Sequence, residues 1–222
     1  PSMAIQRHNV TFDRLSDDVL AKWRAIPPAI VSDMMNRTQC MAGRIKPVKT
    51  GMTVCGQART VTCMVGDNSA AHYAIGLLNP GEILVIDAGG YADVAVWGGI
   101  MTHGAVAKKA GGVVIDGAMR DVAEIAEMGL SAFCAAHVPQ GPHKGFGGVI
   151  DGTISCGGAT VSPGDIVIGD DDGVAVVPLA RATELLAASI EKIADEDATI
   201  ARIKAGETTA QMMGLPEPEM LP

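Results

Sequence analysis

An arginine and an aspartate lie side by side where a short apolar strand is expected to end. The run GGVVIDGAMRD occupies positions 111–121. In layered α/β folds, small anionic ligands bind at the ends of strands. The planar fork of Arg120 matches a carboxylate or an enolate oxygen, and the Asp121 carboxylate is a hard oxygen ligand suited to Mg²⁺. The alternative is a surface ion pair at a helix start, where Asp121 favours the helix dipole.

A pair of glycines upstream points to the same chemistry. Gly98 and Gly99 precede a helix expected over 100–110. Glycines at a helix N-terminus let a ligand approach free backbone N–H groups, which attract anions. The simpler interpretation is that the two glycines only make a turn. Combined with the Arg-Asp pair, however, the amides from Gly98 to Met101 would suit a metal-bound 2-oxo acid.

These residues resemble the motif of the class II 4-hydroxy-4-methyl-2-oxoglutarate/4-carboxy-4-hydroxy-2-oxoadipate aldolase family, which also includes the regulator of ribonuclease E activity (RraA-like proteins). The similarity runs from about Ala29 to the C-terminal helix, and PHKGFGG (142–148) and PGDIVIGDDDGVAVVP (163–178) fit it. The resemblance implies that Arg120 contacts substrate and that Asp121 binds Mg²⁺ or another divalent cation such as Mn²⁺. It also implies backbone contacts to substrate from Gly98, Gly99, Ile100 and Met101.

The chain departs from the family pattern at one position. The resemblance implies an Asp separated by twenty residues from the Arg, with a role in proton transfer around bound pyruvate; here that position is Gly99. This puts aldol cleavage in doubt, but it leaves the pocket for a metal and an oxo acid intact. Because Asp121 is present, we expect an enzyme.

Three functions follow as hypotheses. The first is a Mg²⁺-dependent lyase that cleaves 4-hydroxy-2-oxo diacids to pyruvate, with Arg120 as the catalytic residue and oxaloacetate decarboxylation as a companion activity. The second is a non-catalytic regulator of the ribonuclease E type that binds a protein partner. The third is another Mg²⁺-dependent lyase or hydrolase acting on a different oxo acid.

Composition restricts the possible partners and surroundings. With a net charge of −8, the chain lacks the overall positive charge typical of nucleic-acid-binding proteins. The same charge opposes adsorption to anionic membranes. Five cysteines without a C-x-x-C spacing indicate buried thiols and a reducing compartment. With no basic-then-apolar leader and no apolar run of 18 residues, we expect a cytoplasmic protein with a small 2-oxo acid as its ligand.

The order of elements predicts one α/β domain over residues 1–222, with N-terminal helices and a C-terminal helix. Strands and helices alternate in the middle of the chain and antiparallel strands follow, so we expect mixed sheets. Asp116-Gly117 is expected to be a turn. The resemblance implies a β/β/α layered, swivelling-type domain that assembles as a homotrimer or a dimer of trimers. The expected helices are 16–25, 28–36, 68–78, 100–110, 121–128 and 179–205, and the expected strands are 52–64, 83–86, 113–115, 132–136 and several within 147–178.

Four further features remain candidates. His103 could line the pocket, although a solvent-facing position is favoured. Lys144, in a glycine-rich loop, could meet a distal substrate carboxylate. The resemblance places a Glu from a neighbouring subunit at the site, and Glu196 matches it by spacing. The run 170–172 superficially resembles a calcium loop, but its spacing favours a turn between strands.

Overall fold

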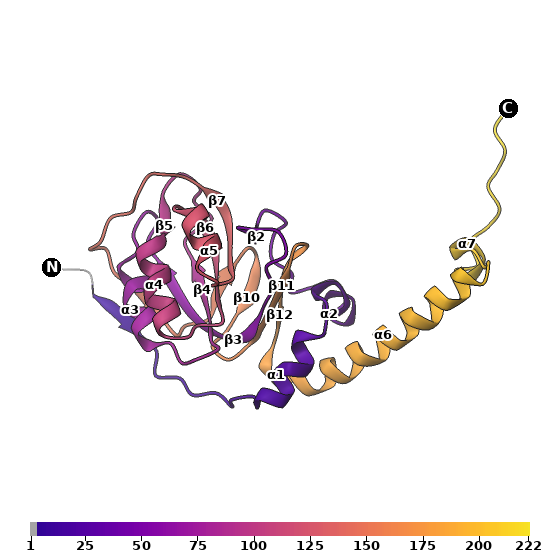
Figure 1. The fold of residues 1–222 in the computed structure, drawn as a ribbon, viewed down its shortest axis with the longest axis horizontal. Helices are drawn as coiled ribbons and strands as arrows, with labels where there is room; N and C mark the ends of the chain where they lie inside the picture. Colours follow the sequence, from indigo (N-terminus) through magenta and orange to yellow (C-terminus); the bar gives the residue numbers. More distant parts are fainter. Residues whose placement is uncertain (1–3) are drawn as a thin grey trace.

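A ten-stranded mixed sheet forms the centre of the molecule (Figure 1). The computed structural model describes residues 4–222. The strands are β1 (Ile5–Arg7), β2 (Lys46–Pro47), β3 (Val54–Cys63), β4 (Ile83–Asp87), β5 (Ala95–Trp97), β6 (Gly112–Met119), β7 (Ala132–His137), β8 (Gly148–Ile150), β9 (Ile154–Cys156), β10 (Ala159–Val161), β11 (Ile166–Asp170) and β12 (Gly173–Val177). The helices are α1 (Asp17–Arg24), α2 (Pro28–Met34), α3 (Ser69–Leu77), α4 (Gly99–Ala107), α5 (Val122–Glu127), the 3₁₀ turn η1 (Leu179–Arg181), α6 (Ala182–Lys204) and α7 (Thr209–Met212).

The parallel strands β3, β4, β6 and β7 lie in that order at the middle of the sheet. Their apolar runs are buried on both faces, as parallel strands require, and Val85 of β4 pairs with Val114 of β6. Strand β5 pairs with the end of β6. The carboxyl ends of β5 and β6 therefore meet at one edge of the molecule.

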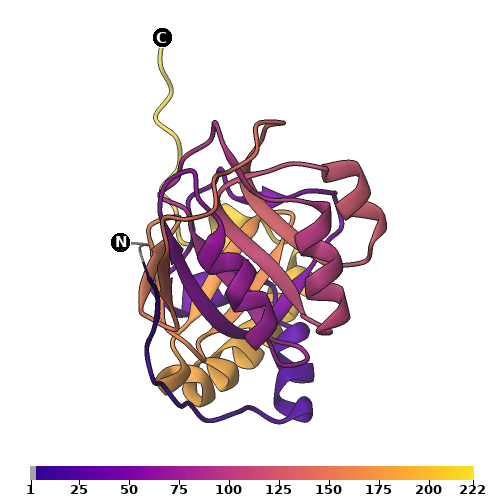
Figure 2. The ribbon, with the colours of Figure 1, turned by 90° about the vertical axis from the view of Figure 1, so that its left-hand side faces the viewer.

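Two further layers cover the sheet. Helices α3, α4 and α5 pack on one face around the buried Trp97, Ile115 and Ile125, and Figure 2 shows these helices side by side over the strands. The β9–β10 hairpin, with β11 and β12, closes the other face around Ile45 and Phe133. Helices α1, α2 and the start of α6 pack on the far side of β11 and β12. This is the expected β/β/α layering with mixed sheets.

Buried ion pairs fasten the N-terminal segment to the sheet near the amino end of β4. Arg59 places Nη1 2.8 Å from both carboxylate oxygens of Asp151 and Nε 3.2 Å from Glu82. Arg7 and Arg14 reach the same two carboxylates at 2.8 Å. We call Arg7, Arg14, Arg59, Glu82 and Asp151 the ion cluster. Because every buried charge in it has a partner, it holds the chain start in place.

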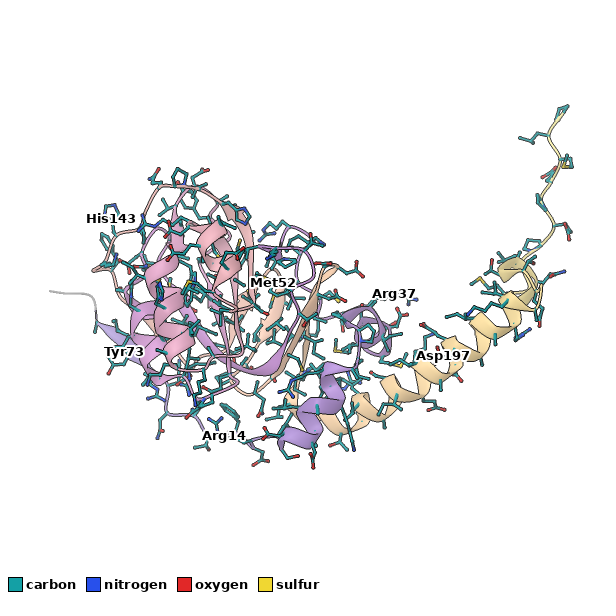
Figure 3. All side chains as sticks on the ribbon, in the orientation of Figure 1. Arg14, Arg37, Met52, Tyr73, His143 and Asp197 are labelled. Carbon is teal, nitrogen blue, oxygen red and sulfur yellow. The ribbon has the colours of Figure 1, made fainter. Side chains whose placement is uncertain are left out.

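The long helix α6 projects away from the body (Figure 1). Its buried side chains are Ala182, Leu185 and Ser189, all in the first third of the helix. Figure 3 shows side chains around the distal part, including Asp197, with no other element beside them. None of the helices in the described part of the chain is long and apolar enough to cross a membrane.

The prediction of a turn at Asp116-Gly117 was wrong, because both residues lie inside β6. The strand continues through them with a shift of pairing between Ile115 and Ala118. Asp116 is tolerated in the buried strand because Arg44 and the Gly157 N–H both donate to its carboxylate, at 2.5 and 2.8 Å. Strand β6 therefore extends to Met119, four residues beyond the predicted strand.

Most other element predictions need only shorter bounds. The helix expected over 100–110 ends at Ala107, and the C-terminal helix is divided into η1 and α6. The antiparallel strands expected within 147–178 are present, although β8 also pairs in parallel with β1, a strand the sequence did not predict. The run 170–172 lies at the turn of the β11–β12 hairpin, as expected. All five cysteines are free thiols.

Candidate active site

The site forms where β5 and β6 end together. The Arg120 N–H donates to the Trp97 carbonyl at 3.0 Å, which joins the two strand ends. Trp97 is fully buried, and its indole N–H donates to the Thr102 hydroxyl at 2.8 Å. The Thr102 hydroxyl donates in turn to the Gly98 carbonyl at 3.0 Å. This chain of hydrogen bonds fixes the first turn of α4 beside Arg120.

Asp121 has a left-handed backbone conformation between β6 and α5. Its φ is +58°, in a region where Asp is found more often than most non-glycine residues. The bend turns its carboxylate back toward α4, where Oδ2 accepts the Gly99 N–H at 3.0 Å and lies 3.8 Å from Arg120 Nε. Both side chains are 43% exposed. Such strain is characteristic of functional sites.

Glycine is required beside this pair for reasons of space. A Cβ on Gly98 would lie 2.7 Å from Asp121 Oδ2 and 3.2 Å from Arg120 Cγ. A Cβ on Gly141 would lie 2.7 Å from Arg120 Nη1, so the guanidinium rests against bare backbone. The Arg-Asp pair is therefore held between two glycine backbones, and its remaining faces are open.

Two adjoining cavities share Arg120 and Asp121. The first, about 230 Å³, contains Gly98, Gly99, Ile100 and Met101, so the structure brings every predicted site residue to one place. The second, about 370 Å³, continues past the end of β7 and includes His137. Because Gly99 gives its N–H to Asp121, the amides of Ile100 and Met101 are the ones left for a ligand at this helix N-terminus.

Another part of the wall of the smaller cavity comes from the start of α3 and the loop before β8. Asn68, His72 and Lys144 line it together with Arg120 and Asp121. The Asn68 side chain is buried, and its amide nitrogen donates to the Val96 carbonyl at 3.0 Å. Its Oδ1 has no hydrogen-bond partner within residues 4–222. The sequence analysis missed Asn68 and His72, because neither stands in a recognisable ligand spacing.

Asp67 ties the Lys144 loop to the start of α3. Its carboxylate accepts the Gly145 N–H at 2.8 Å and the Phe146 N–H at 3.2 Å, and also bonds Ser69. Burial opposes ionisation, but these hydrogen bonds lower the pKa of Asp67 below its ordinary value. The loop that carries Lys144 is thus fixed at the cavity that this residue lines, and contact of Lys144 with a distal substrate carboxylate stays a prediction.

Two other candidates lie elsewhere in this chain. His103 is 68% exposed and approaches Glu124 at 3.4 Å, so it faces solvent as favoured. Glu196 lies on the projecting part of α6 and pairs with Lys192 at 3.4 Å. Within one protomer it does not join the cavity, and its assignment to a neighbouring subunit's site stays a prediction.

The donor set around Asp121 fits a loosely held hard cation. Within residues 4–222 no three His, Cys, Asp or Glu side chains gather into a metal-binding group. Asp121 alone offers a half-exposed carboxylate beside two open cavities. Mg²⁺ is commonly bound by one or two carboxylates and keeps several waters or substrate oxygens. Asp121 is thus suited to such an ion and not to a fully enclosed metal.

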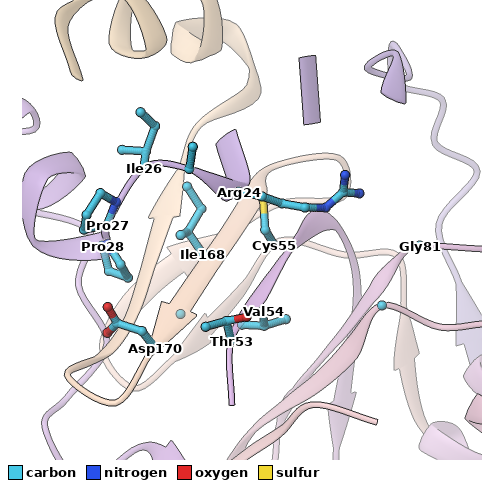
Figure 4. Close-up of a pocket in the computed structure, with 13 residues that line it drawn as sticks. Arg24, Ile26, Pro27, Pro28, Thr53, Val54, Cys55, Gly81, Ile168 and Asp170 are labelled. Carbon is cyan, nitrogen blue, oxygen red and sulfur yellow. The ribbon is translucent and has the colours of Figure 1, made fainter. Parts of the chain in front are cut away.

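A larger cavity lies at the opposite ends of the strands (Figure 4). Its volume is about 450 Å³, and Arg24, Cys55 and Asp170 contribute side chains around Ile168. Burial raises the pKa of the Cys55 thiol to about 11, so this cysteine is protonated at neutral pH and is a poor nucleophile. The start of α2 also lines this cavity, but Pro27 and Pro28 have no backbone N–H to offer an anion, unlike the helix start beside Arg120.

Comparison with known proteins decides the family. The model of the RraA-like family, described as Aldolase/RraA, matches residues 28–176. The chain belongs to this family. An RraA-like relative from Halalkalibacterium halodurans, whose name provisionally assigns it as a 4-hydroxy-4-methyl-2-oxoglutarate aldolase, is 34% identical over 82% of this chain and 86% of its own length. The protein DlpA of Legionella pneumophila is 31% identical over 82% of this chain and 31% of its own length.

Solved structures, some of them titled as RraA proteins, show the same fold. An uncharacterized protein from Pseudomonas syringae aligns with a TM-score of 0.78 at 26% identity, covering 90% of this chain and 98% of that one. The Streptomyces coelicolor protein RraAS2, titled an unusual member of the RNase ES inhibitor family, aligns with a TM-score of 0.77 at 25% identity, covering 85% and 100%. The RraA-like family thus contains proteins named as aldolases and others named as inhibitors of RNA processing.

Proposed function

We propose that this protein is a divalent-cation-dependent lyase that releases pyruvate from 4-hydroxy-2-oxo diacids and also decarboxylates oxaloacetate. The observation that carries the proposal is the joint placement of Arg120, Asp121 and the open amides of α4 on one cavity. A protein acting only through its outer surface has no need of this arrangement. The family assignment, with relatives named as aldolases, supports the same reaction class.

Each wall of the cavity has a distinct role in this proposal. The N–H groups of Ile100 and Met101 at the start of α4 hold the C1 carboxylate, because a helix N-terminus attracts anions. Arg120 donates to the 2-oxo oxygen and stabilises the negative charge that develops there. Asp121 would hold Mg²⁺, which when bound supplies Lewis-acid polarisation of the same oxygen.

Both reactions lead to the same enolate of pyruvate. In aldol cleavage the C3–C4 bond breaks and a carbonyl compound leaves, whereas in decarboxylation CO₂ leaves. A well-placed donor to the developing oxyanion is worth about 3 kcal/mol in the transition state. Arg120 therefore serves both substrates, while a base for the C4 hydroxyl serves only the aldol reaction.

The first test measures pyruvate release from oxaloacetate and from 4-hydroxy-4-methyl-2-oxoglutarate. We expect both activities with added Mg²⁺ or Mn²⁺ and neither with excess chelator. Oxalate, which resembles the enolate of pyruvate, should inhibit and should raise the thermal midpoint only when the cation is present. If neither substrate yields pyruvate above the rate without protein, the lyase assignment fails.

The alternative is a regulator that inhibits a ribonuclease, since solved RraA-like structures carry such titles. A regulator would act through its surface, so it should bind its partner equally well after Asp121→Ala. The test is ribonuclease E activity with and without this protein. Inhibition that survives the substitution, together with no lyase activity, would favour the regulator.

We also propose that the protein acts as a homotrimer or a dimer of trimers. The distal part of α6 exposes Ile190, Ile200 and Ile203, which a monomer leaves in contact with water. Mass measurement in solution, for example by light scattering, tests this directly.

A further inference from the structure

The part of the cavity wall formed by the start of α3 carries polar groups with no assigned task. Asn68 is 3% exposed, and its Oδ1 has no partner within the described chain. An unpaired buried carbonyl oxygen costs free energy unless a ligand or water donates to it. Because the Asn68 amide nitrogen is engaged by the Val96 carbonyl at 3.0 Å, Oδ1 is the atom left for a donor. Asn68 lines the cavity, and a ligand hydroxyl that reached Oδ1 would supply the missing donor.

His72 lies one helical turn along α3 from Asn68 and lines the same cavity. Asn68 is the N-cap of α3 and is buried, whereas His72 lies in the first turn of the helix and is exposed; both line the same cavity. The other charged groups around the cavity are Arg120, Asp121 and Lys144. Of the five histidines in the chain, His72 is the one that lines this cavity with the Arg-Asp pair.

We propose that Asn68 and His72 form the subsite for the C4 hydroxyl of the substrate, and that His72 is the acid–base catalyst of aldol cleavage. This rests on the proposed function. With the C1 carboxylate and the 2-oxo group held at the Arg120 wall, the C4 end of the substrate extends toward α3. Asn68 Oδ1 accepts a hydrogen bond from the hydroxyl and orients it for His72. Lys144 lies beside it to meet a distal carboxylate.

One imidazole is enough for both proton transfers of aldol cleavage. His72 takes the proton of the C4 hydroxyl, the C3–C4 bond breaks, and its electron pair remains on the pyruvate fragment as the enolate. C4 becomes the carbonyl carbon of the second product. The protonated imidazole then gives the proton to C3 of the enolate, which yields pyruvate. His72 thereby performs the proton transfer for which position 99, a glycine here, has no side chain.

The electrostatics of His72 agree with this role. Partial desolvation of the ring lowers its pKa, and the positive charge of Lys144 lowers it further. A histidine with a lowered pKa is neutral at pH 7 and can accept a proton. The rate of aldol cleavage should accordingly fall as pH drops through this pKa, because the protonated ring is no longer a base.

The deciding experiment follows exchange of pyruvate methyl protons with D₂O by NMR, which needs a base at C3 but no bond cleavage. We expect His72→Asn to slow exchange and aldol cleavage by about a hundredfold, in the range of lost general acid–base catalysis. Oxaloacetate decarboxylation should fall less, since it needs no base at C4. The matched control is His143→Asn on the neighbouring loop, which should leave all three rates unchanged.

Two further measurements, one of oxalate binding and one of the His72 titration, separate this proposal from the proposed function. Oxalate with Mg²⁺ should raise the thermal midpoint of wild type and of His72→Asn equally, since His72 does not hold the oxo acid. In the wild type without metal, the His72 imidazole resonance should titrate below the ordinary histidine pKa. If oxalate fails to bind to wild type, the proposed function fails. If oxalate binds but His72→Asn exchanges within threefold of wild type, His72 is not the base. Should His72→Asn not fold, His72→Gln replaces it in the same assays.

Discussion

Arginine and carboxylate side chains lie at both ends of the parallel strands, but they are buried and paired at one end and half-exposed at the other. In the ion cluster near the amino end of β4, Arg59, Glu82 and Asp151 are buried and mutually bonded at 2.8–3.2 Å. At the carboxyl end of β6, Arg120 and Asp121 are 43% exposed, and their charged atoms lie 3.8 Å apart. Charges that satisfy one another hold a structure together, whereas charges left with open faces are available to a ligand.

Asp121→Ala is the strongest test of whether the half-exposed pair at the carboxyl end of β6 carries the activity. We expect cation-dependent pyruvate release to fall to the rate without protein, because the carboxylate that would hold the cation is gone. The thermal midpoint should fall only modestly, since the half-exposed side chain hydrogen-bonds just the Gly99 N–H, while alanine tolerates the left-handed backbone at φ +58° less well than aspartate. Asp170→Asn in the larger cavity is the matched control and should retain full activity. Unchanged activity and Mg²⁺ dependence in Asp121→Ala would contradict the metal assignment.

Arg120→Lys tests whether activity depends on the two parallel N–H donors of the guanidinium or only on its positive charge. A lysine ammonium is a point charge and cannot reproduce two parallel N–H donors. We expect kcat/KM to fall about a hundredfold, equivalent to about 2.7 kcal/mol. Arg24→Lys, at the opposite end of the strands, should leave kcat/KM unchanged. A loss smaller than about threefold would show that Arg120 serves the structure alone.

Gly98→Ala probes the space around the pair. The new Cβ would lie 2.7 Å from Asp121 Oδ2, so the carboxylate and the Arg120 stem must shift. A displacement of this size should lower kcat/KM about tenfold or more. Gly76→Ala in α3 meets nothing within 4 Å and provides the control. Equal activity of the two alanine variants would mean that the observed geometry of the pair is not needed.

Gly99→Asp addresses the family carboxylate that this chain lacks. Gly99 does not have a positive φ, so the backbone permits a side chain. A Cβ there would lie 2.5 Å from Glu124 Oε2, but the half-exposed Glu124 can swing aside. We expect aldol cleavage to rise a few-fold relative to decarboxylation, measured as the ratio of the two rates. If the wild-type protein already cleaves the aldol substrate as fast as it decarboxylates oxaloacetate, a carboxylate at position 99 is not needed for aldol cleavage.

Glu82→Gln should have the smallest effect on catalysis and a large one on stability. Burial alone would raise the pKa of Glu82, but the Asn79 N–H and the charges of Arg14 and Arg59 hold it below its ordinary value. The unfolded chain therefore binds more protons at this group. Its stabilisation is present above the ordinary pKa and is lost as pH falls through the lower folded pKa.

We expect Glu82→Gln to lower the free energy of unfolding at pH 7 by about 3 kcal/mol, as breaking a buried pair does. The acid-side loss of stability, followed by urea unfolding from pH 7 to about pH 3, should become shallower. Pyruvate release at pH 7 should match wild type. A large loss of activity with normal stability would show that the amino end takes part in the chemistry.

The part of the candidate site that the sequence predicts is the part where chemistry and chain order coincide. Arg120 and Asp121 are adjacent in the chain, and Gly98 stands at the start of a helix with a recognisable glycine pair. The layered α/β architecture could also be predicted, from apolar runs such as that of β4 and from the change to alternating strands after Gly147.

The remaining features depend on contacts between segments far apart in the sequence. Asn68 and His72 join the site only because α3 packs beside α4. Asp116 was mistaken for a turn residue because its hydrogen-bond partners, Arg44 and Gly157, lie 72 and 41 residues away. Strand β1 has exposed side chains, and its pairing with β8 leaves no hydrophobic pattern to detect.

Because α6 packs on the core only at its start and then projects into solvent, its amide hydrogen-exchange rates should increase along the helix. Its first turns, around Leu185 and Ser189, can open only with the packed core. The turns beyond Ile193 make no contact with this core cluster in the protomer and open as an isolated helix does, with little protection. Mass spectrometry of amide exchange should therefore show protection falling toward Lys204 in a dilute monomer. Any protection regained at higher protein concentration would report which turns a second protein surface covers.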